Sequence, residues 1–235
     1  MDKKLIVIGG GEIKNKTTLK IDEYIANLAK AHAGDKRATA LFLGTASHDS
    51  MPYFNSFRKT YTSVFDIKAE VALIVYGEMN LSHIEEKFDK ADCVYIGGGD
   101  TLFMLEKWKE TGIDKLLLKA YDEGKIIAGL SAGAICWFEK MYTDYEIMRG
   151  LSSEYAVKDG LGLISGMMCP HFNERERDFS SAFIKSGQKF AYCVENDAGL
   201  EFTNGKLSMV LSSGGKAFTA EIVDGKFVKK EIYGI

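Results

Sequence analysis

Ser131 lies among small residues at the end of an apolar run, in the segment GLSAG (129–133). The spacing Gly-x-Ser-x-Gly is typical of a nucleophile elbow, a tight turn between a strand and a helix. Such a turn pushes the serine side chain out over the edge of a sheet, and its small neighbours leave room for it. The first amides of the helix expected after Ser131 would stabilise an anionic intermediate. We therefore predict that Ser131 is a nucleophile; a serine that serves only the turn is the alternative.

A serine nucleophile needs a general base, usually a histidine that a third side chain orients. Of the four histidines, His32 and His83 lie at the ends of expected helices, and we interpret them as surface residues. His171 follows an apolar run that ends in Pro170, where a strand is expected to turn into a helix. His48 lies in the loop after the second expected strand and is the weaker candidate. We predict that His171 is the base.

The spacing does not decide which carboxylate would orient His171. Asp144 and Glu146 follow the helix expected after the elbow, whereas Glu195 and Asp197 follow the last expected parallel strand. Either loop could bring an acid to the imidazole.

A glycine run closes both the first and the fourth expected strand. The second run, in IGGGDT (96–101), would supply the backbone N–H of Gly98 or Gly99 to an oxyanion hole, with that of Ala132 as the other donor. A phosphate-binding loop is the alternative. Neither run is followed by Gly-Lys-Ser/Thr or has the spacing G-x-G-x-x-G, which argues against nucleotide binding.

The 235-residue chain is 46% hydrophobic and carries a net charge of −3. No linker, repeat or low-complexity segment divides it, so we expect a single domain over residues 1–235. The absence of a basic stripe argues against nucleic acid as a partner, and no apolar run is long enough to span a membrane. The four cysteines, among them the rival nucleophile Cys136, include no C-x-x-C. We expect buried, reduced thiols in a cytoplasmic protein, with no zinc site or disulfide framework.

Strands and helices are expected to alternate through the first half of the chain. The expected strands cover residues 5–9, 38–44, 71–77, 93–99 and 125–130, and the expected helices cover 17–33, 52–61, 82–90, 101–110 and 113–123. Such nearly continuous apolar strands predict an α/β fold with a doubly wound, mostly parallel sheet, whose ligands bind beyond the carboxyl ends of the strands. Towards the C-terminus, apolar and polar residues alternate around Asn204-Gly205 and Asp224-Gly225, which predicts an antiparallel hairpin extension.

Three segments together, GLSAGA (129–134), IGGGDT (96–101) and CPHF (169–172), resemble the aspartyl dipeptidase and cyanophycinase family of serine peptidases. Their order and spacing also match, over roughly residues 5 to 202. The resemblance implies a flavodoxin-like sheet similar to that of class I glutamine amidotransferases, a small peptide as substrate, and no cofactor or metal. It also implies that Ser131 is the nucleophile and His171 the general base.

The resemblance leaves the third catalytic residue open. Family members carry an acid after the elbow helix, where this chain has Asp144. They carry another after the last parallel strand, where this chain has Glu195, with Asn196 as the alternative match. We favour Asp144.

This chain departs from the family pattern at two places. Where the aspartyl dipeptidases have GGGNT, this chain has GGGDT, so Asp100 puts an acid beside the oxyanion loop. If Asp100 points into the pocket, it would repel a substrate carboxylate. The charged segment NERERDF (173–179) contains Arg175 and Arg177, either of which could bind a substrate carboxylate in a bidentate manner. A solvated helix face is the alternative for each, so specificity for an N-terminal aspartate stays open.

We therefore expect a serine peptidase or amidase that cleaves short peptides through an acyl-enzyme, with dipeptides carrying an N-terminal aspartate among the candidate substrates. Because the base must be neutral, activity should fall below about pH 6. An esterase of the α/β-hydrolase type is one alternative, which parallel pairing of the first strand with the second would exclude. A ligand-binding relative without catalysis is the other, and a homodimer is left open as the assembly.

Overall fold

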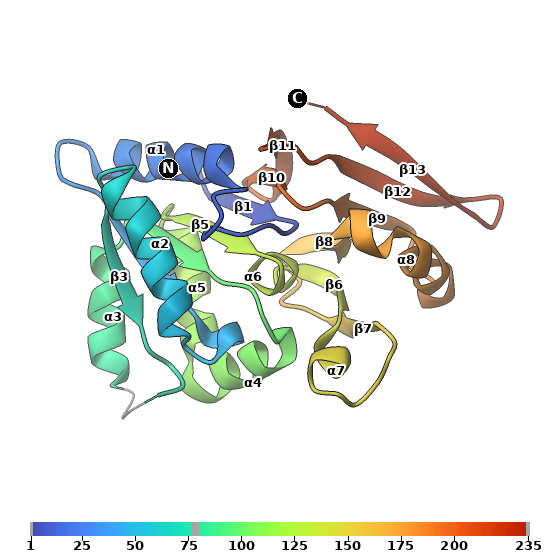
Figure 1. Cartoon of the computed structure of the whole chain (residues 1–235), viewed down its shortest axis with the longest axis horizontal. Coiled ribbons are helices and arrows are strands. Elements are labelled where there is room, and N and C mark those ends of the chain that lie inside the picture. Colours follow the sequence, from blue (N-terminus) through green and yellow to red (C-terminus); the bar gives the residue numbers. More distant parts are fainter. Residues whose placement is uncertain (1, 77–79, 234–235) are drawn as a thin grey trace.

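The computed structural model describes residues 2–76 and 80–233 and confirms the α/β class, with the strands in two sheets where one was expected (Figure 1). The first sheet contains β1 (Lys4–Ile8), β2 (Thr39–Leu43), β3 (Lys68–Ala72), β4 (Cys93–Ile96), β5 (Ile126–Leu130), β10 (Ala198–Thr203) and β11 (Lys206–Ser212). Its order is β11-β10-β1-β5-β4-β2-β3. The strands β1, β5, β4, β2 and β3 are parallel, and β10 and β11 extend them in antiparallel fashion.

The second sheet contains β6 (Phe138–Thr143), β7 (Ala156–Asp159), β8 (Ile164–Cys169), β9 (Phe190–Val194), β12 (Ala217–Val223) and β13 (Lys226–Ile232). Its order is β13-β12-β9-β8-β6-β7, and β8 is parallel to both of its neighbours. The two expected hairpin turns therefore belong to different sheets. Asn204-Gly205 joins β10 to β11 in the first sheet, and Asp224-Gly225 joins β12 to β13 in the second.

The described helices are α1 (Leu19–Ala33), α2 (Met51–Ser63), α3 (Leu81–Lys90), α4 (Thr101–Thr111), α5 (Ile113–Asp122), α6 (Ala132–Ile135), α7 (Tyr145–Met148) and α8 (Phe172–Ser186), together with the single 3₁₀ turn at Thr45–Ser47. Three of these helices have a side-chain N-cap, whose oxygen accepts a hydrogen bond from the backbone N–H three residues further on. These caps are Ser50 for α2, Asn80 for α3 and Asp100 for α4. No described helix has the length and apolarity that crossing a membrane would require.

Helices cover both faces of the first sheet. Side chains alternate along a strand, so Leu5 and Val7 of β1 face one side, and Ile6 and Ile8 face the other. The first pair lies in a core with α3, α4 and α5, and the second pair lies in a core with α1 and α2. The core around Leu5 and Val7 continues into β6, β8 and β9, so it joins the two sheets.

The third strand differs from its expected range of 71–77. It begins earlier and ends at Ala72, because the next backbone amides turn to a buried carboxylate. The N–H groups of Ile74 and Val75 each donate to Asp49 at 2.6 Å, so they are not available to a neighbouring strand. Gly77 lies outside the described residues.

The helix expected after Ser131 is also shorter than the apolar pattern suggests. It is the single turn α6, after which the chain enters β6 at Phe138. Apolar residues continue through both elements because both are buried, and periodicity cannot separate a buried helix from a buried strand over so short a run.

Candidate active site

Ser131 occupies a strained turn at the end of β5, with φ +52° and ψ −108°. This is a backbone region that side-chain-bearing residues rarely adopt. A Cβ on Gly129 would lie 2.0 Å from the carbonyl oxygen of Gly133, and one on Gly133 would lie 2.4 Å from that of Ile96. A side chain at position 129 or 133 would collide with the backbone, and this explains why both flanking positions of the Gly-x-Ser-x-Gly pattern are glycines.

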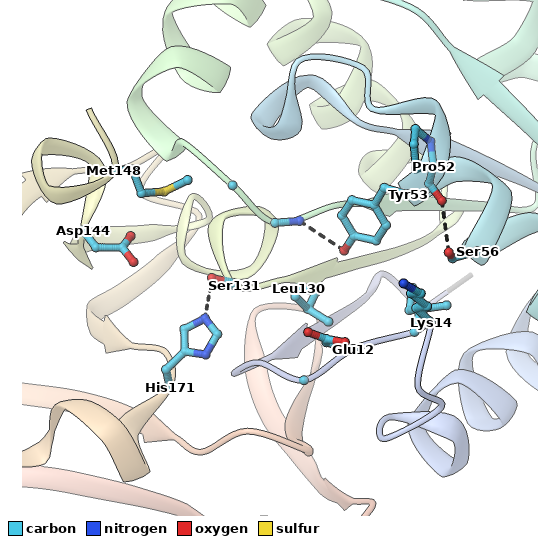
Figure 2. Close-up of a pocket in the computed structure, with 14 residues that line it drawn as sticks. Glu12, Lys14, Pro52, Tyr53, Ser56, Leu130, Ser131, Asp144, Met148 and His171 are labelled. Atoms are coloured by element: carbon cyan, nitrogen blue, oxygen red, sulfur yellow. Dashed lines mark hydrogen bonds between the residues drawn. The ribbon is translucent and has the colours of Figure 1, made fainter. Parts of the chain in front are cut away.

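His171 begins α8 at the end of β8, in a left-handed conformation with φ +50°. Its Nε2 atom lies 2.8 Å from the Ser131 Oγ atom (Figure 2). β5 belongs to the first sheet and β8 to the second, so the predicted nucleophile and base meet across the junction of the two sheets.

Asn196 holds the other nitrogen of the imidazole, because its Oδ1 atom lies 2.6 Å from His171 Nδ1. The Nδ2 group of Asn196 donates to the Glu174 carboxylate at 2.5 Å, which leaves Oδ1 for the imidazole. An amide oxygen only accepts hydrogen bonds, so Nδ1 carries the proton and Nε2 is left as the acceptor for the Ser131 hydroxyl. This is the tautomer that a general base needs.

The backbone at the end of β1 supports Ser131, His171 and the residue that follows Asn196. The carbonyl oxygens of Ile8 and the two glycines after it accept the N–H groups of Ser131, His171 and Asp197, at 2.9, 3.0 and 3.0 Å. A Cβ on Gly10 would lie 2.1 Å from Asn196 Oδ1 and 2.3 Å from the His171 Nδ1 atom. The first glycine run, for which a phosphate-binding loop is the alternative, thus makes room for the histidine and the asparagine.

Neither predicted acid contacts the imidazole. Asp144, the favoured acid, accepts a hydrogen bond from Arg175 at 2.7 Å. Glu195 accepts the backbone N–H of Lys216 at 3.0 Å. Consecutive side chains of extended backbone point to opposite sides, so the residue after Glu195 reaches His171 instead. The position expected for an acid is therefore filled by a neutral amide.

The environment of His171 favours its neutral form. Burial lowers the pKa of His171 below the ordinary 6.5, and the positive charge of Arg175 lowers it further. The hydrogen bond that His171 donates to Asn196 acts in the opposite direction without overcoming burial. A carboxylate on Nδ1 would have stabilised the imidazolium far more.

The second glycine run lies directly beside the nucleophile. A Cβ on Gly98 would lie 3.3 Å from the Ser131 Cβ atom, and both Gly98 and Gly99 line the pocket. The N–H of Ala132 is the first of α6, where no preceding helical turn supplies an acceptor. The Gly98 N–H donates to the Tyr53 hydroxyl at 3.3 Å, and burial raises the pKa of Tyr53 to about 12. Tyr53 is thus a protonated phenol beside the predicted oxyanion donors.

A pocket of about 540 Å³ surrounds Ser131 and His171. It is lined by Gly11, Glu12, Ile13, Lys14, Pro52, Tyr53, Ser56, Gly98, Gly99, Leu130, Ser131, Asp144, Met148 and His171. Figure 2 shows Asp144 and Met148 on one side of the Ser–His pair, and Tyr53 and Lys14 on the other.

The three predicted substrate-binding residues all lie outside this lining. Asp100 is 6% exposed and pairs with Arg149, so its carboxylate is turned away from a substrate. Arg175 is buried against Asp144, and Arg177 is exposed on the outer side of α8. Asp100 and Arg175 therefore form ion pairs within the protein, and none of the three side chains is placed to contact a substrate carboxylate.

Other candidates from the sequence lie apart from the Ser–His pair. The His48 ring packs on Phe103, with ring centroids 4.1 Å apart, and does not line the pocket. Cys136 is buried, its thiol lies 3.4 Å from the carbonyl oxygen of Gly133, and burial raises its pKa. All four cysteines are free and buried, which confirms the prediction of core thiols. Within residues 2–76 and 80–233, no group of three or more His, Cys, Asp or Glu side chains is placed to hold a metal ion.

Sequence reasoning missed Tyr53, Glu12, Lys14 and Met148, all of which line the pocket. A usable signal existed for the first three. They follow the carboxyl ends of strands in βα loops or in the first turn of a helix, where ligands of parallel sheets bind.

A serine hydroxyl bonded to a histidine, in a pocket at the carboxyl edge of a parallel sheet, is an arrangement typical of hydrolases with a covalent step. The chain belongs to peptidase family S51, whose family model matches residues 5–210, and the predicted family resemblance is confirmed. The chain is 33% identical over 227 residues to uncharacterized peptidase YgaJ of Bacillus subtilis (strain 168), an alignment that covers 92% of this chain and 91% of that one. It is 28% identical over 159 residues to uncharacterized peptidase Lin0382 of Listeria innocua serovar 6a, covering 57% and 76% of the two chains.

A solved structure shows the same fold at lower sequence identity. The crystal structure of a peptidase from an acI-B1 Actinobacterium superposes with a TM-score of 0.70 at 16% identity, and the match covers 100% of this chain and 97% of that one. The first strand of the present chain does not neighbour the second, so the pairing proposed for excluding an esterase is not formed. Family membership, not strand pairing, identifies the chain as a peptidase.

Proposed function

We propose that this protein is a serine-type peptidase that cleaves short peptides through an acyl-enzyme, with Ser131, His171 and Asn196 as its catalytic residues. The observation that carries the proposal is the continuous chain of hydrogen bonds from Ser131 Oγ to His171 Nε2 and from His171 Nδ1 to Asn196 Oδ1, at 2.8 and 2.6 Å. Membership of a peptidase family supports it independently.

In the first half-reaction, Ser131 Oγ attacks the carbonyl carbon of the scissile amide, and its proton passes to His171 Nε2. The imidazolium then protonates the leaving nitrogen, the C–N bond breaks, and the acyl-enzyme remains. In the second half-reaction, water loses a proton to His171 and attacks the ester, which releases the acid and restores Ser131. The N–H of Ala132 would stabilise the oxyanion in both steps, with that of Gly99 as the second donor, because the Gly98 N–H donates to the Tyr53 hydroxyl.

Asn196 fixes the orientation and tautomer of His171 but has no charge to offset the imidazolium. The lowered pKa of His171 agrees with this, because burial and Arg175 both disfavour its protonated form. We infer a base that is neutral at any pH above the ordinary histidine range and that gains little electrostatic help when it is protonated.

The pocket suits a short peptide in size and charge. Its volume of about 540 Å³ is within the range of small-ligand sites. Asp144, beside the Ser–His pair, has a side chain that is 30% exposed and could accept a substrate ammonium group. Among the described residues that line the pocket, Lys14 is the only lysine or arginine. An N-terminal aspartate would therefore have Lys14 as its sole basic partner, and dipeptides of this kind are one of several classes to test.

The strand order supports the proposed relation to flavodoxin-like sheets. The strands β3-β2-β4-β5 follow the order 2-1-3-4 of such a sheet, and β1 takes the place of the fifth strand. Four free, buried cysteines are also what a cytoplasmic location would give, which stays a proposal.

A fluorophosphonate probe tests the function directly. Folded protein should be labelled at Ser131, and Ser131→Ala should lose both labelling and peptide turnover, whereas Ser180→Ala, on the far part of α8, should keep both. A panel of dipeptides that varies the N-terminal residue, with aspartate included, identifies the substrate class. Absence of labelling in folded protein would favour a non-catalytic relative, and hydrolysis of nitrophenyl esters without any peptide cleavage would favour an esterase.

A further inference from the structure

The Asp100 carboxylate, which departs from the asparagine of the related dipeptidases, is fully engaged within the protein. Asp100 directly follows Gly98 and Gly99, and its own N–H donates to the carbonyl oxygen of Ala46 at 2.8 Å. Its Oδ1 atom accepts the N–H of Phe103 at 3.0 Å, which caps α4. These two bonds fix Asp100, at the end of the glycine loop, to the turn at Thr45–Ser47 and to the start of α4.

Arg149 pairs with both oxygens of the Asp100 carboxylate. Its Nε–H donates to Asp100 Oδ2 at 2.6 Å, and its NH2 group donates to Oδ1 at 3.2 Å. The guanidinium also lies 5.2 Å from the centre of the Tyr145 ring. A bidentate pair of this kind fixes orientation as well as distance. Because an asparagine could cap α4 equally well, the cap alone does not account for a carboxylate at Asp100.

Arg149 directly follows α7, the short helix that forms one wall of the pocket. Asp144 precedes this helix and Met148 closes it, and both line the pocket. Of the four residues of α7, only Tyr145 is buried, so apolar packing contributes little to its position. Two ion pairs hold its ends: Asp144 with Arg175 of α8, and Arg149 with Asp100.

We propose that Asp100 and Arg149 are a positioning pair that fixes the α7 wall against the glycine loop and thereby sets the width of the peptide pocket. The pair contacts no reacting atom. Its loss would let α7 leave the substrate-competent position for part of the time. The apparent affinity for substrate falls in proportion to the fraction of molecules in which α7 is in this position. Saturating substrate returns α7 to that position, so kcat is unchanged.

Two variants test the pair. Asp100→Asn keeps the cap and removes the charge, and Arg149→Met keeps an apolar stem against Tyr145 and removes the guanidinium. Each should raise KM for a cleaved short peptide about fivefold with kcat nearly unchanged, the scale expected of a partly exposed ion pair. The double variant should be no worse than either single one. Arg37→Met, which breaks the exposed Arg37–Asp66 pair at the opposite ends of the strands, is the matched control and should change neither constant.

Hydrogen exchange gives a second readout that does not need turnover. The N–H groups of Met148, Arg149 and Leu151 are hydrogen-bonded within the α7 segment. Their exchange should accelerate about fivefold in both single variants and stay unchanged in Arg37→Met. The kinetic arm rests on the proposed peptidase function, but the exchange arm does not, so a failure of each can be told apart. Additive effects in the double variant, a change confined to kcat, or unaltered exchange would overturn the proposal.

Discussion

Replacing Asn196 by aspartate tests the role of the neutral amide most directly. The Asn196 Oδ1 atom lies 2.6 Å from His171 Nδ1, so Asn196→Asp would put a negative charge against the imidazole without changing the shape of the side chain. The exchange keeps the hydrogen bond with His171 Nδ1, adds a charge beside the imidazole, and removes the hydrogen bond that Asn196 donates to Glu174. Its effect on pKa and rate should therefore be readable without a change of fold.

The size of the effect follows from distance and burial. Two unit charges about 4 Å apart interact by about 4 kcal/mol at an effective dielectric constant near 20, which sets an upper bound of about three pH units on the rise of the His171 pKa. Glu174 reduces this gain, because its carboxylate now binds Asn196 Nδ2 and would face a second carboxylate instead. Because the Glu174 charge itself raises the pKa of His171, Glu174 is kept in this test, and we expect a rise of about one to two pH units in Asn196→Asp.

The assay is the pH dependence of kcat and of kcat/KM with a cleaved dipeptide between pH 4 and pH 9. The acidic limb of the variant should move to higher pH by that amount, so the variant is slower than the parent near pH 5. Near pH 8 it should be faster, by up to about tenfold for each unit of pKa, because the imidazolium of the transition state is stabilised. An acidic limb that stays in place, or moves to lower pH, would refute the proposed role of His171 as a general base oriented by Asn196.

Three further predictions follow from single residues. Since burial and a nearby arginine lower the pKa of His171, kcat/KM of the unmodified protein should be controlled by a group that titrates below 6.5, and a pH–rate profile with its acidic midpoint above 7 would contradict this. Gly10→Ala should abolish turnover while circular dichroism stays native, because the added Cβ would lie 2.1 Å from Asn196 Oδ1; full activity would count against the described geometry. Burial raises the pKa of Asp22 to about 6 despite two hydroxyl donors, above its ordinary 3.8. The folded protein therefore keeps a proton that the unfolded chain loses, and stability present below about pH 4 is lost as the pH rises through 6, by about 3 kcal/mol in all. Asp22→Asn should raise the free energy of unfolding at pH 7.5 by about 1–3 kcal/mol and leave it nearly unchanged at pH 4, as urea unfolding would measure; equal effects at both pH values would be inconsistent with a buried charge.

Most of the first sheet could be predicted because its strands are short apolar runs that end at glycines. The Ser131 turn and the His171 junction could be predicted for the same reason, since each follows a buried strand. The exception is the third strand, where Asp49 takes the amides that periodicity assigns to a sheet. A carboxylate brought in from another loop leaves no signal in the local pattern.

The side chain that contacts the His171 Nδ1 atom, and the second sheet, could not be predicted from the sequence alone. Glu195, Asn196 and Asp197 are consecutive, and only the pairing of β9 with its neighbours decides which of them faces the imidazole. Those neighbours are β8 and β12, which are about twenty residues away along the chain on either side. Local propensity specifies strands, but it does not specify which strands share a sheet. Asp144 was favoured by its place in the chain, and its ion pair with Arg175 depends on tertiary contacts.

The hydrogen bond between Ser131 and His171 also depends on the relative position of the two sheets. One partner ends a strand of the first sheet and the other ends a strand of the second, and their atoms lie 2.8 Å apart. A relative shift of about 1 Å would lengthen this contact beyond hydrogen-bonding range while every strand ladder stayed intact. Turnover should therefore vanish at a lower temperature or denaturant concentration than secondary structure does. Two consecutive residues at the end of β1, Ile8 and Gly9, bind the backbone N–H groups of Ser131 and His171, so this one segment fixes both partners of the contact.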